Sequence, residues 1–187
     1  NSVFPYLACG EFLWQGLSVR IFRISFSGEL AYELAVPASY GDSVIRAIMA
    51  AGAEWGIFPY GTEALGVMRI EKGHVAGNEL NGTTTAADLC LGRMISSKKD
   101  FIGRVLSGRP GLTAHNRPTL VGVQPVEHRE RLHAGSHFMS VDVGIAHRES
   151  QGYLSSVAFS PMLGRWIGLG FLARGRQRQG ERILACD

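Results

Sequence analysis

Glu33 is the residue whose type and position point most directly to chemistry. It lies within a run of alternating apolar residues, and the side chains two positions away on either side are Ala31 and Ala35. Side chains at i and i+2 of a strand share a face, so the carboxylate stands between methyl-sized neighbours that leave room for a flat ligand. A carboxylate accepts two parallel N–H bonds from an amidine- or guanidine-like edge. Spacing alone favours the simpler alternative, a solvated glutamate on a half-exposed strand.

Two groups of basic side chains are weaker candidates. Arg69 and Lys72, together with Glu71, lie near the end of a predicted helix, where a ligand-binding cluster competes with ordinary surface charge. The pattern favours surface charge, with Lys72 well placed against the helix dipole. The arginines between residues 174 and 182 lack interleaved aromatic residues, so a solvated hairpin tip is favoured over nucleic-acid contact.

The histidines do not indicate a metal site. Five of the six lie between His115 and His147, but His128, His133 and His137 fall in predicted strand and loop segments. No cysteine accompanies them and no H-E-x-x-H helix is present. We therefore predict loop histidines and no metal.

The element that must position Glu33 is a hairpin or near-hairpin. Alternation from Leu17 to Phe26 predicts a strand with a change of phase, and residues 30–36 alternate again. Ser27-Gly28-Glu29 between the two runs predicts the turn.

Two helices and a run of strands follow. The first helix is expected to begin between Ser39 and Asp42 and to end at Gly52, and the second covers residues 62–72 and is closed by Gly73. Beyond a Gly- and Pro-containing linker at 107–111, short apolar runs at regular spacing predict a small barrel or sandwich. The strand candidates are 119–126, 143–146, 153–159, 166–172 and 182–185. The fold class predicted is α+β, with an α+β segment at 1–108 and an all-β domain at 109–187.

Composition limits the class of protein. Of the 187 residues 45% are hydrophobic, enough for a packed core. The formal net charge of +3 is too small to imply nucleic acid and is compatible with an anionic small ligand. Three widely spaced cysteines fit a reducing cytoplasm, and neither a membrane-length apolar run nor a signal peptide is present. Because the chain opens at Asn1 and soon enters a strand pattern, we expect a fragment of a longer protein.

The order of short motifs resembles the aminomethyltransferase family, which includes the glycine cleavage T-protein and the folate domains of sarcosine oxidase and dimethylglycine oxidase. The similarity covers most of the chain from about residue 18, and the triple threonine, the 88–93 segment and the paired lysines resemble the sarcosine oxidase alpha subunit most. The matching segments are Ser27–Leu34, Met68–Gly73, Gly77–Leu80, Thr83–Thr85, Lys99–Arg104, Ser160–Gly164 and Ile167–Gly170.

The resemblance implies a site for tetrahydrofolate. Glu33 occupies the place of the family's pterin-binding glutamate, and Phe26 falls where relatives often have a tyrosine beside the pterin. Leu65 falls where the T-protein has an arginine near the ligand, which weakens a full transfer of that site. The family's catalytic aspartate belongs to an earlier part of the module, so no catalytic residue is assigned and activity of the chain alone is not expected.

The resemblance also implies a reaction for the intact protein. A flavin centre elsewhere oxidises an N-methyl amine, and the folate module captures the one-carbon unit as 5,10-methylenetetrahydrofolate. FAD, FMN and NAD would bind outside this chain, and other subunits of a hetero-oligomeric oxidase would be partners. The alternatives are a stand-alone aminomethyltransferase of the T-protein type and a non-catalytic scaffold of the same fold.

Overall fold

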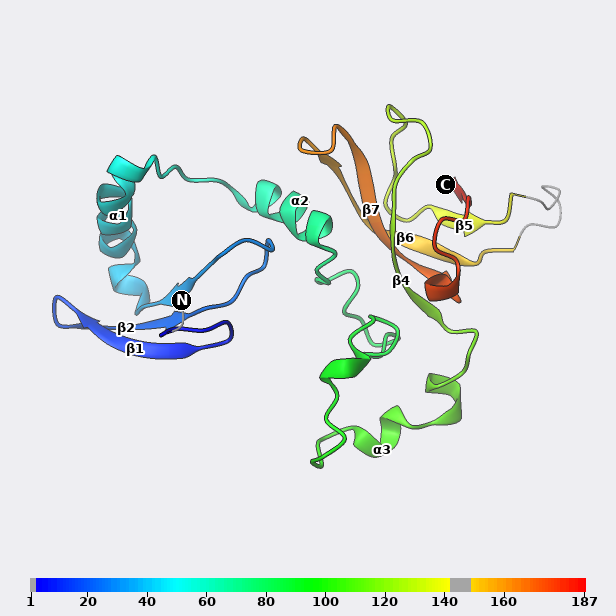
Figure 1. Cartoon of the computed structure of the whole chain (residues 1–187), viewed down its shortest axis with the longest axis horizontal. Helices are drawn as coiled ribbons and strands as arrows, with labels where there is room; N and C mark the ends of the chain where they lie inside the picture. Colours follow the sequence, from blue (N-terminus) through cyan, green and yellow to red (C-terminus); the bar gives the residue numbers. More distant parts are fainter. Residues whose placement is uncertain (1–2, 142–148) are drawn as a thin grey trace. The chain divides into compact units, whose positions relative to one another are not determined.

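The computed structural model describes residues 3–141 and 149–187. The chain divides into two compact units, Asn1–Lys72 and Gly73–Asp187, which are coloured from blue to green and from green to red in Figure 1. Both helices and antiparallel sheets are present, so the α+β class is confirmed. The division into domains at 1–108 and 109–187 stays a prediction.

The first unit contains a three-stranded antiparallel sheet in the order β1-β2-β3 and two α-helices. Its strands are β1 (Cys9–Trp14), β2 (Leu17–Phe22) and β3 (Glu33–Ala35), and its helices are α1 (Gly41–Gly52), α2 (Thr62–Lys72) and the 3₁₀ turns η1 (Ala38–Tyr40) and η2 (Ala53–Trp55).

Both predicted helices are confirmed. Asp42 lies in the first turn of α1, where its charge complements the helix dipole, and Ser39 belongs to the preceding 3₁₀ turn. Gly73 follows α2 with a φ of 75°, a left-handed conformation that glycine adopts without strain. This conformation explains why the helix ends at Lys72.

The predicted hairpin is confirmed as an antiparallel pair, but its strands are shorter than expected. β2 ends at Phe22 and β3 begins at Glu33, so residues 23–32 form a loop in place of a tight turn. Gly28, with a φ of 100°, lies in this loop. Strand β1 was not predicted, because its sequence, Cys-Gly-Glu-Phe-Leu-Trp, does not alternate between apolar and polar residues.

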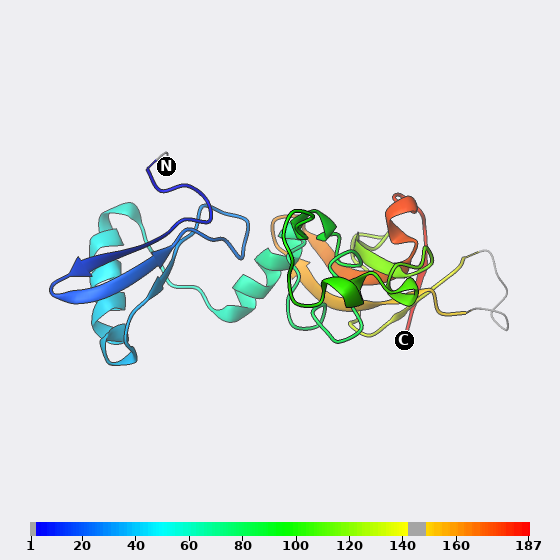
Figure 2. The ribbon, with the colours of Figure 1, turned by 90° about the horizontal axis from the view of Figure 1, so that it is seen from below.

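The two faces of this sheet differ in burial. Val19 is 2% exposed and shares its face with Ile21 and Leu34. Figures 1 and 2 show α1 lying along one face of the sheet. The opposite face is open, with Leu13 76% exposed and Arg20 and Glu33 also exposed. A large apolar side chain on an open sheet face is typical of a surface that contacts another segment or molecule.

The second unit contains a five-stranded antiparallel sheet in the order β4-β7-β6-β5-β8. Among the described residues no pairing joins β4 to β8, so the predicted barrel domain is seen here as a sheet with two edges. Its elements are β4 (Pro118–Val123), β5 (His137–Met139), β6 (Gly152–Ser160), β7 (Arg165–Ala173), β8 (Leu184–Cys186), α3 (Arg104–Ser107), η3 (Gly92–Met94), η4 (Pro110–Leu112) and η6 (Gly175–Gln177).

Four of the strand predictions in this unit are confirmed, as β4, β6, β7 and β8. The segment 143–146 lies outside the described residues, and β5, with only three residues, was not predicted. The arginine-rich segment does not form a hairpin tip, because β7 and β8 that flank it are not neighbours in the sheet.

The core of this unit is a cluster of large apolar side chains, one of which packs against a glycine of the sheet. Leu132, Phe138, Leu154 and Leu172 form one buried cluster. A Cβ atom built on Gly170 would lie 2.9 Å from the Phe138 ring and 2.5 Å from the Tyr153 carbonyl oxygen. Only glycine at this position lets the Phe138 ring pack against the strand.

A buried carboxyl group ties the loop after α2 to this sheet. Glu79 is 0% exposed and accepts hydrogen bonds from Ser155 Oγ at 2.5 Å and from Ser156 Oγ at 2.7 Å. The Ala76 backbone N–H donates to its other oxygen at 2.9 Å. Consecutive strand residues normally face opposite sides, but a register shift between Leu154 and Ser156 lets both hydroxyls reach Glu79.

An ion pair ties the next part of the loop to the start of β4. Arg117 Nε donates to Asp88 Oδ1 at 3.0 Å, and the Thr85 backbone N–H donates to Asp88 Oδ2 at 2.8 Å. Burial acts to raise the pKa of Asp88, but the hydrogen bonds from Arg117 and Thr85 outweigh it and hold the pKa below its ordinary value of 3.8. The hydrogen bond with Asp88, and the charge of its carboxylate, raise the pKa of Arg117.

The Glu79→Gln variant is expected to unfold at lower urea concentration. The amide places an N–H group where an oxygen accepted hydrogen bonds, so buried donors lose their acceptor, at a cost of roughly 1–3 kcal/mol. Urea denaturation followed by circular dichroism measures this loss. Glu127→Gln, a substitution of an exposed carboxylate in the same unit, is the matched control, and equal midpoints for the two variants would contradict the anchoring role.

The Asp88→Asn variant is expected to lose stability in a pH-dependent manner. Because the pKa of Asp88 is lower in the folded than in the unfolded chain, the ionised carboxylate stabilises the fold above the unfolded pKa, and this stabilisation is lost as the pH falls through the folded pKa. The unmodified chain should therefore exceed Asp88→Asn in the free energy of unfolding at pH 6, and the difference should shrink below about pH 4.

Urea titrations at both pH values measure the difference. Asp100, whose side chain is 89% exposed and 3.9 Å from Arg104, supplies the control variant Asp100→Asn. A gap between Asp88→Asn and the unmodified chain that stays constant with pH would show that the charge of Asp88 does not stabilise the fold.

Candidate functional site

Glu33 is the first residue of β3 and lies on the open face of the first sheet. The strand register places it opposite Phe22 of β2, and Ala35 opposite Arg20. Residues that lie opposite each other in an antiparallel pair share a face. Glu33 is exposed, and within the described part of the chain no side chain is hydrogen-bonded or ion-paired with its carboxylate.

Of the two alanines predicted to flank Glu33, one lies in the same strand and the other in the preceding loop. Ala35 follows Glu33 on the same face of β3, as the alternation predicts. Ala31 precedes the strand, in the loop, and lines a pocket there. The carboxylate therefore has an open approach from the sheet face, with a methyl group on the strand side.

The two aromatic side chains near Glu33 differ in position. Phe26, expected beside the ligand, lies half-buried in the loop between β2 and β3. Phe22 lies directly across from Glu33 on the same face. Phe22 could not be recognised from the sequence, because the alternation joins it to the loop residues Ile24 and Phe26 in one run. The strand register, which the sequence does not reveal, is the signal that identifies it.

The other charges on this face are paired with each other. Arg20 donates to Glu11 from Nε at 3.0 Å and from Nη2 at 2.6 Å. The hydrogen bond with the Glu11 carboxylate and its charge raise the pKa of Arg20. Arg20 is therefore already engaged, which leaves the Glu33 carboxylate as an acceptor for a ligand.

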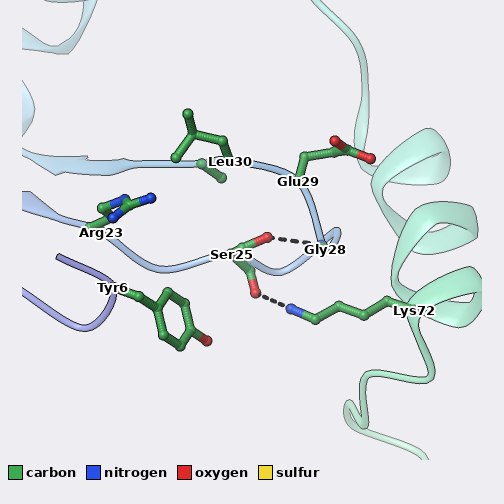
Figure 3. A pocket seen from close by; sticks show the side chains of 8 residues that line it. Tyr6, Arg23, Ser25, Gly28, Glu29, Leu30 and Lys72 are labelled. Carbon is green, nitrogen blue, oxygen red and sulfur yellow. Dashed lines mark hydrogen bonds between the residues drawn. The ribbon is translucent and has the colours of Figure 1, made fainter. Parts of the chain in front are cut away.

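A pocket of about 250 Å³ lies in the same unit, at the loop that leads into β3. Figure 3 shows its lining side chains, which come from the amino-terminal segment, from the loop and from the end of α2. Glu33 and Phe26 do not line it. The lining residues are Tyr6, Arg23, Ser25, Gly28, Glu29, Leu30, Ala31 and Lys72.

Two cations of this pocket bind backbone carbonyl groups. Lys72 Nζ donates to the Ser25 carbonyl oxygen at 2.6 Å, and Arg23 Nη1 donates to the Phe4 carbonyl oxygen at 3.1 Å. Lys72 is exposed in the last turn of α2, as expected for surface charge, and in addition binds a loop 47 residues away in sequence. The expectation of surface charge is wrong for Arg69, which is only 9% exposed.

Two histidines make pairwise contacts, His133 from a loop, as predicted, and His137 from strand β5. His133 Nδ1 lies 2.7 Å from Asp187 Oδ2, and His137 Nδ1 lies 2.7 Å from Ser150 Oγ. The hydrogen bond from Ser136 and then that from His133 lower the pKa of Asp187. Across residues 3–141 and 149–187 no group of three or more potential metal ligands is found. His147 lies outside the described residues.

Comparisons with known proteins match nearly the whole length of the chain. The family model described as GCVT N-terminal domain matches residues 1–99, and the one described as glycine cleavage T-protein C-terminal barrel domain matches residues 119–185. None of the described helices has the length and hydrophobicity required to cross a membrane.

Several relatives are similar in sequence. The sarcosine oxidase subunit alpha of Rhizobium meliloti (strain 1021) is 48% identical over an alignment of 187 positions, which covers 98% of this chain and 19% of that protein. An aminomethyltransferase of Streptomyces coelicolor is 31% identical over 175 residues, 92% of this chain and 46% of that enzyme. The chain thus spans about a fifth of the oxidase subunit and less than half of the aminomethyltransferase.

A solved structure shows the same fold. The aminomethyltransferase T of the Bartonella henselae glycine cleavage system superposes with a TM-score of 0.76 at 20% sequence identity, over 89% of this chain and 45% of that one. This likeness shows the fold, and the two family models, which match residues of both units, show the family. The chain belongs to the aminomethyltransferase family, the family of the glycine cleavage T-protein.

Proposed function

We propose that the protein to which this chain belongs binds a reduced folate, with Glu33 as the acceptor for the pterin ring. The observation that carries the proposal is an exposed carboxylate on an open sheet face, without a hydrogen-bond partner in the described chain and with a small residue, Ala35, beside it. An ionised carboxylate can accept two parallel N–H bonds, which is the pattern that the aminopyrimidine edge of a pterin presents.

The side chains present fit such a ring. Phe22, opposite Glu33 in the strand register, supplies an aromatic surface on the same face. Phe26, in the loop, is the residue that the family resemblance assigns to the pterin, and it remains a candidate. Reduced folate, when bound, supplies two nitrogen atoms that hold a one-carbon unit. The part of this chain would be to orient the ring, since catalysis of this kind depends on positioning.

The reaction we propose for the intact protein is that of a sarcosine oxidase alpha subunit. Oxidative demethylation of an N-methyl amine elsewhere in the protein would deliver a one-carbon unit, recovered as 5,10-methylenetetrahydrofolate. The identity of 48% with the Rhizobium meliloti subunit supports this reading. Flavin and nicotinamide cofactors would bind outside this chain, other subunits would be partners, and the protein would be cytoplasmic.

A stand-alone aminomethyltransferase is the second candidate. Relatives with that name match 92% of this chain, at 31% identity. Both candidates require the same folate site, so the experiments on Glu33 and Phe22 apply to either. An upstream dehydrogenase region in the same reading frame would separate them.

The Glu33→Gln variant of the full-length protein is expected to bind tetrahydrofolate about 10–100-fold more weakly. The amide loses one acceptor oxygen and the negative charge, and a hydrogen bond to a charged group contributes about 1.5–3 kcal/mol. Calorimetry with tetrahydrofolate measures the affinity. Glu54→Gln, on an exposed 3₁₀ turn of the same unit, is the control, and unchanged affinity in Glu33→Gln would remove Glu33 from the site.

The Phe22→Leu and Phe26→Leu variants distinguish the two aromatic candidates. If the strand register positions the pterin, Phe22→Leu weakens tetrahydrofolate binding by about tenfold, because an aromatic pair contributes about 0.5–1.5 kcal/mol beyond its buried area. Phe26→Leu should then have the smaller effect. Calorimetry on the full-length variants gives both values, and a larger loss in Phe26→Leu would assign the ring contact to the loop residue instead.

A further inference from the structure

The pocket at the loop before β3 is built entirely from residues of the first unit. Its walls come from the amino-terminal segment, from residues 23–31 and from Lys72 at the end of α2 (Figure 3). Glu33 and Phe26 are not among its lining residues, so what the pocket binds is a question separate from the pterin proposal.

Arg23 contributes one positive charge to the lining of the pocket. Its Nη1 is taken by the Phe4 carbonyl oxygen at 3.1 Å. Its Nε is buried and has no hydrogen-bond acceptor in the described chain. A buried donor without an acceptor is unfavourable. Nη2 takes part in no hydrogen bond within the described residues and is not buried as Nε is, so this nitrogen of a pocket-lining side chain can donate to a carboxylate.

Lys72 supplies a second positive charge to the same pocket. Its ammonium group donates one hydrogen bond, to the Ser25 carbonyl oxygen at 2.6 Å, and an ammonium group has three N–H bonds to donate. In residues 3–141 and 149–187 neither Lys72 nor Arg23 forms an ion pair with a carboxylate. Glu29 lines the pocket, but in Figure 3 its carboxylate points away from Arg23.

We propose that this pocket binds the carboxylate group of a small-molecule ligand, held by Arg23 and Lys72. Leu30, Ala31 and the Tyr6 ring supply the uncharged part of the lining for the carbon skeleton that carries the carboxylate. Two sources share this chemistry, namely the glutamate tail of a folate and a free N-methyl amino acid. The volume of about 250 Å³ suits either a tail or a small molecule.

The test uses the 187-residue chain itself, because every lining residue belongs to it. The probes are p-aminobenzoylglutamate, which carries the tail without the pterin, and sarcosine. Two-dimensional ¹H–¹⁵N spectra follow the Arg23 Nε resonance during each titration. We expect this resonance to move and to saturate with one of the two probes, and the responding probe identifies the source of the carboxylate.

Variants separate binding from a general effect on the loop. Lys72→Gln removes the charge, and Arg23→Lys keeps the charge but removes the guanidinium Nη2 donor. Each should raise the dissociation constant by about tenfold or more. Lys72→Arg should restore binding. Arg46→Gln removes a cation of α1 that pairs with Asp42 away from the pocket and should leave the constant unchanged.

Three results would overturn the proposal. The first is that neither probe moves the Arg23 Nε resonance up to about 10 mM, a range that includes weak affinities. The second is that Lys72→Gln and Arg23→Lys bind as the unmodified chain does while circular dichroism shows them folded. The third is an equal loss in Arg46→Gln, which would show nonspecific attraction to net charge. Binding of the pterin at Glu33 bears on none of these outcomes.

Discussion

The candidate site depends on a strand pairing of only three residues. The antiparallel register of β2 and β3 turns Glu33 toward the open face of the sheet and sets Phe22 beside it. A shift of one residue would turn Glu33 to the opposite face, which carries Val19 at 2% exposure. Burial of Val19, with the half-buried Ile21 on the same side of β2, therefore determines where the carboxylate on the neighbouring strand points.

Much of the secondary structure could be predicted from local signals. The ends of α2 follow from helical spacing and from Gly73, whose left-handed conformation no other residue adopts as easily. The long strands β6 and β7 follow from apolar runs bounded by turn residues. β1 and β5 escaped prediction because one lacks alternation and the other has only three residues. Their place in a sheet depends on partners far away in the sequence.

The side chains that organise the site and the loops were much harder to predict. Lys72 looks like any lysine at a helix end until the chain brings Ser25 to it. Glu79 looks like a solvated loop residue, although it is fully buried against the hydroxyls of β6. Arg23 gave no signal in the sequence. The roles of these side chains depend on where they lie in the fold and not on their residue type. Their places depend on contacts between residues that are 47 to 77 positions apart in the sequence.

The register shift in β6 has a consequence for how this strand tolerates changes of length. Residues before Leu154 and after Ser156 pair with β7 in two different phases, and the two hydroxyls stand at the junction between them. Removing one residue at the junction would restore a regular ladder but take away one of the serine hydroxyl groups that donate to the Glu79 carboxyl group. Insertions and deletions, which surface loops accommodate easily, should therefore be rare at this point of the strand.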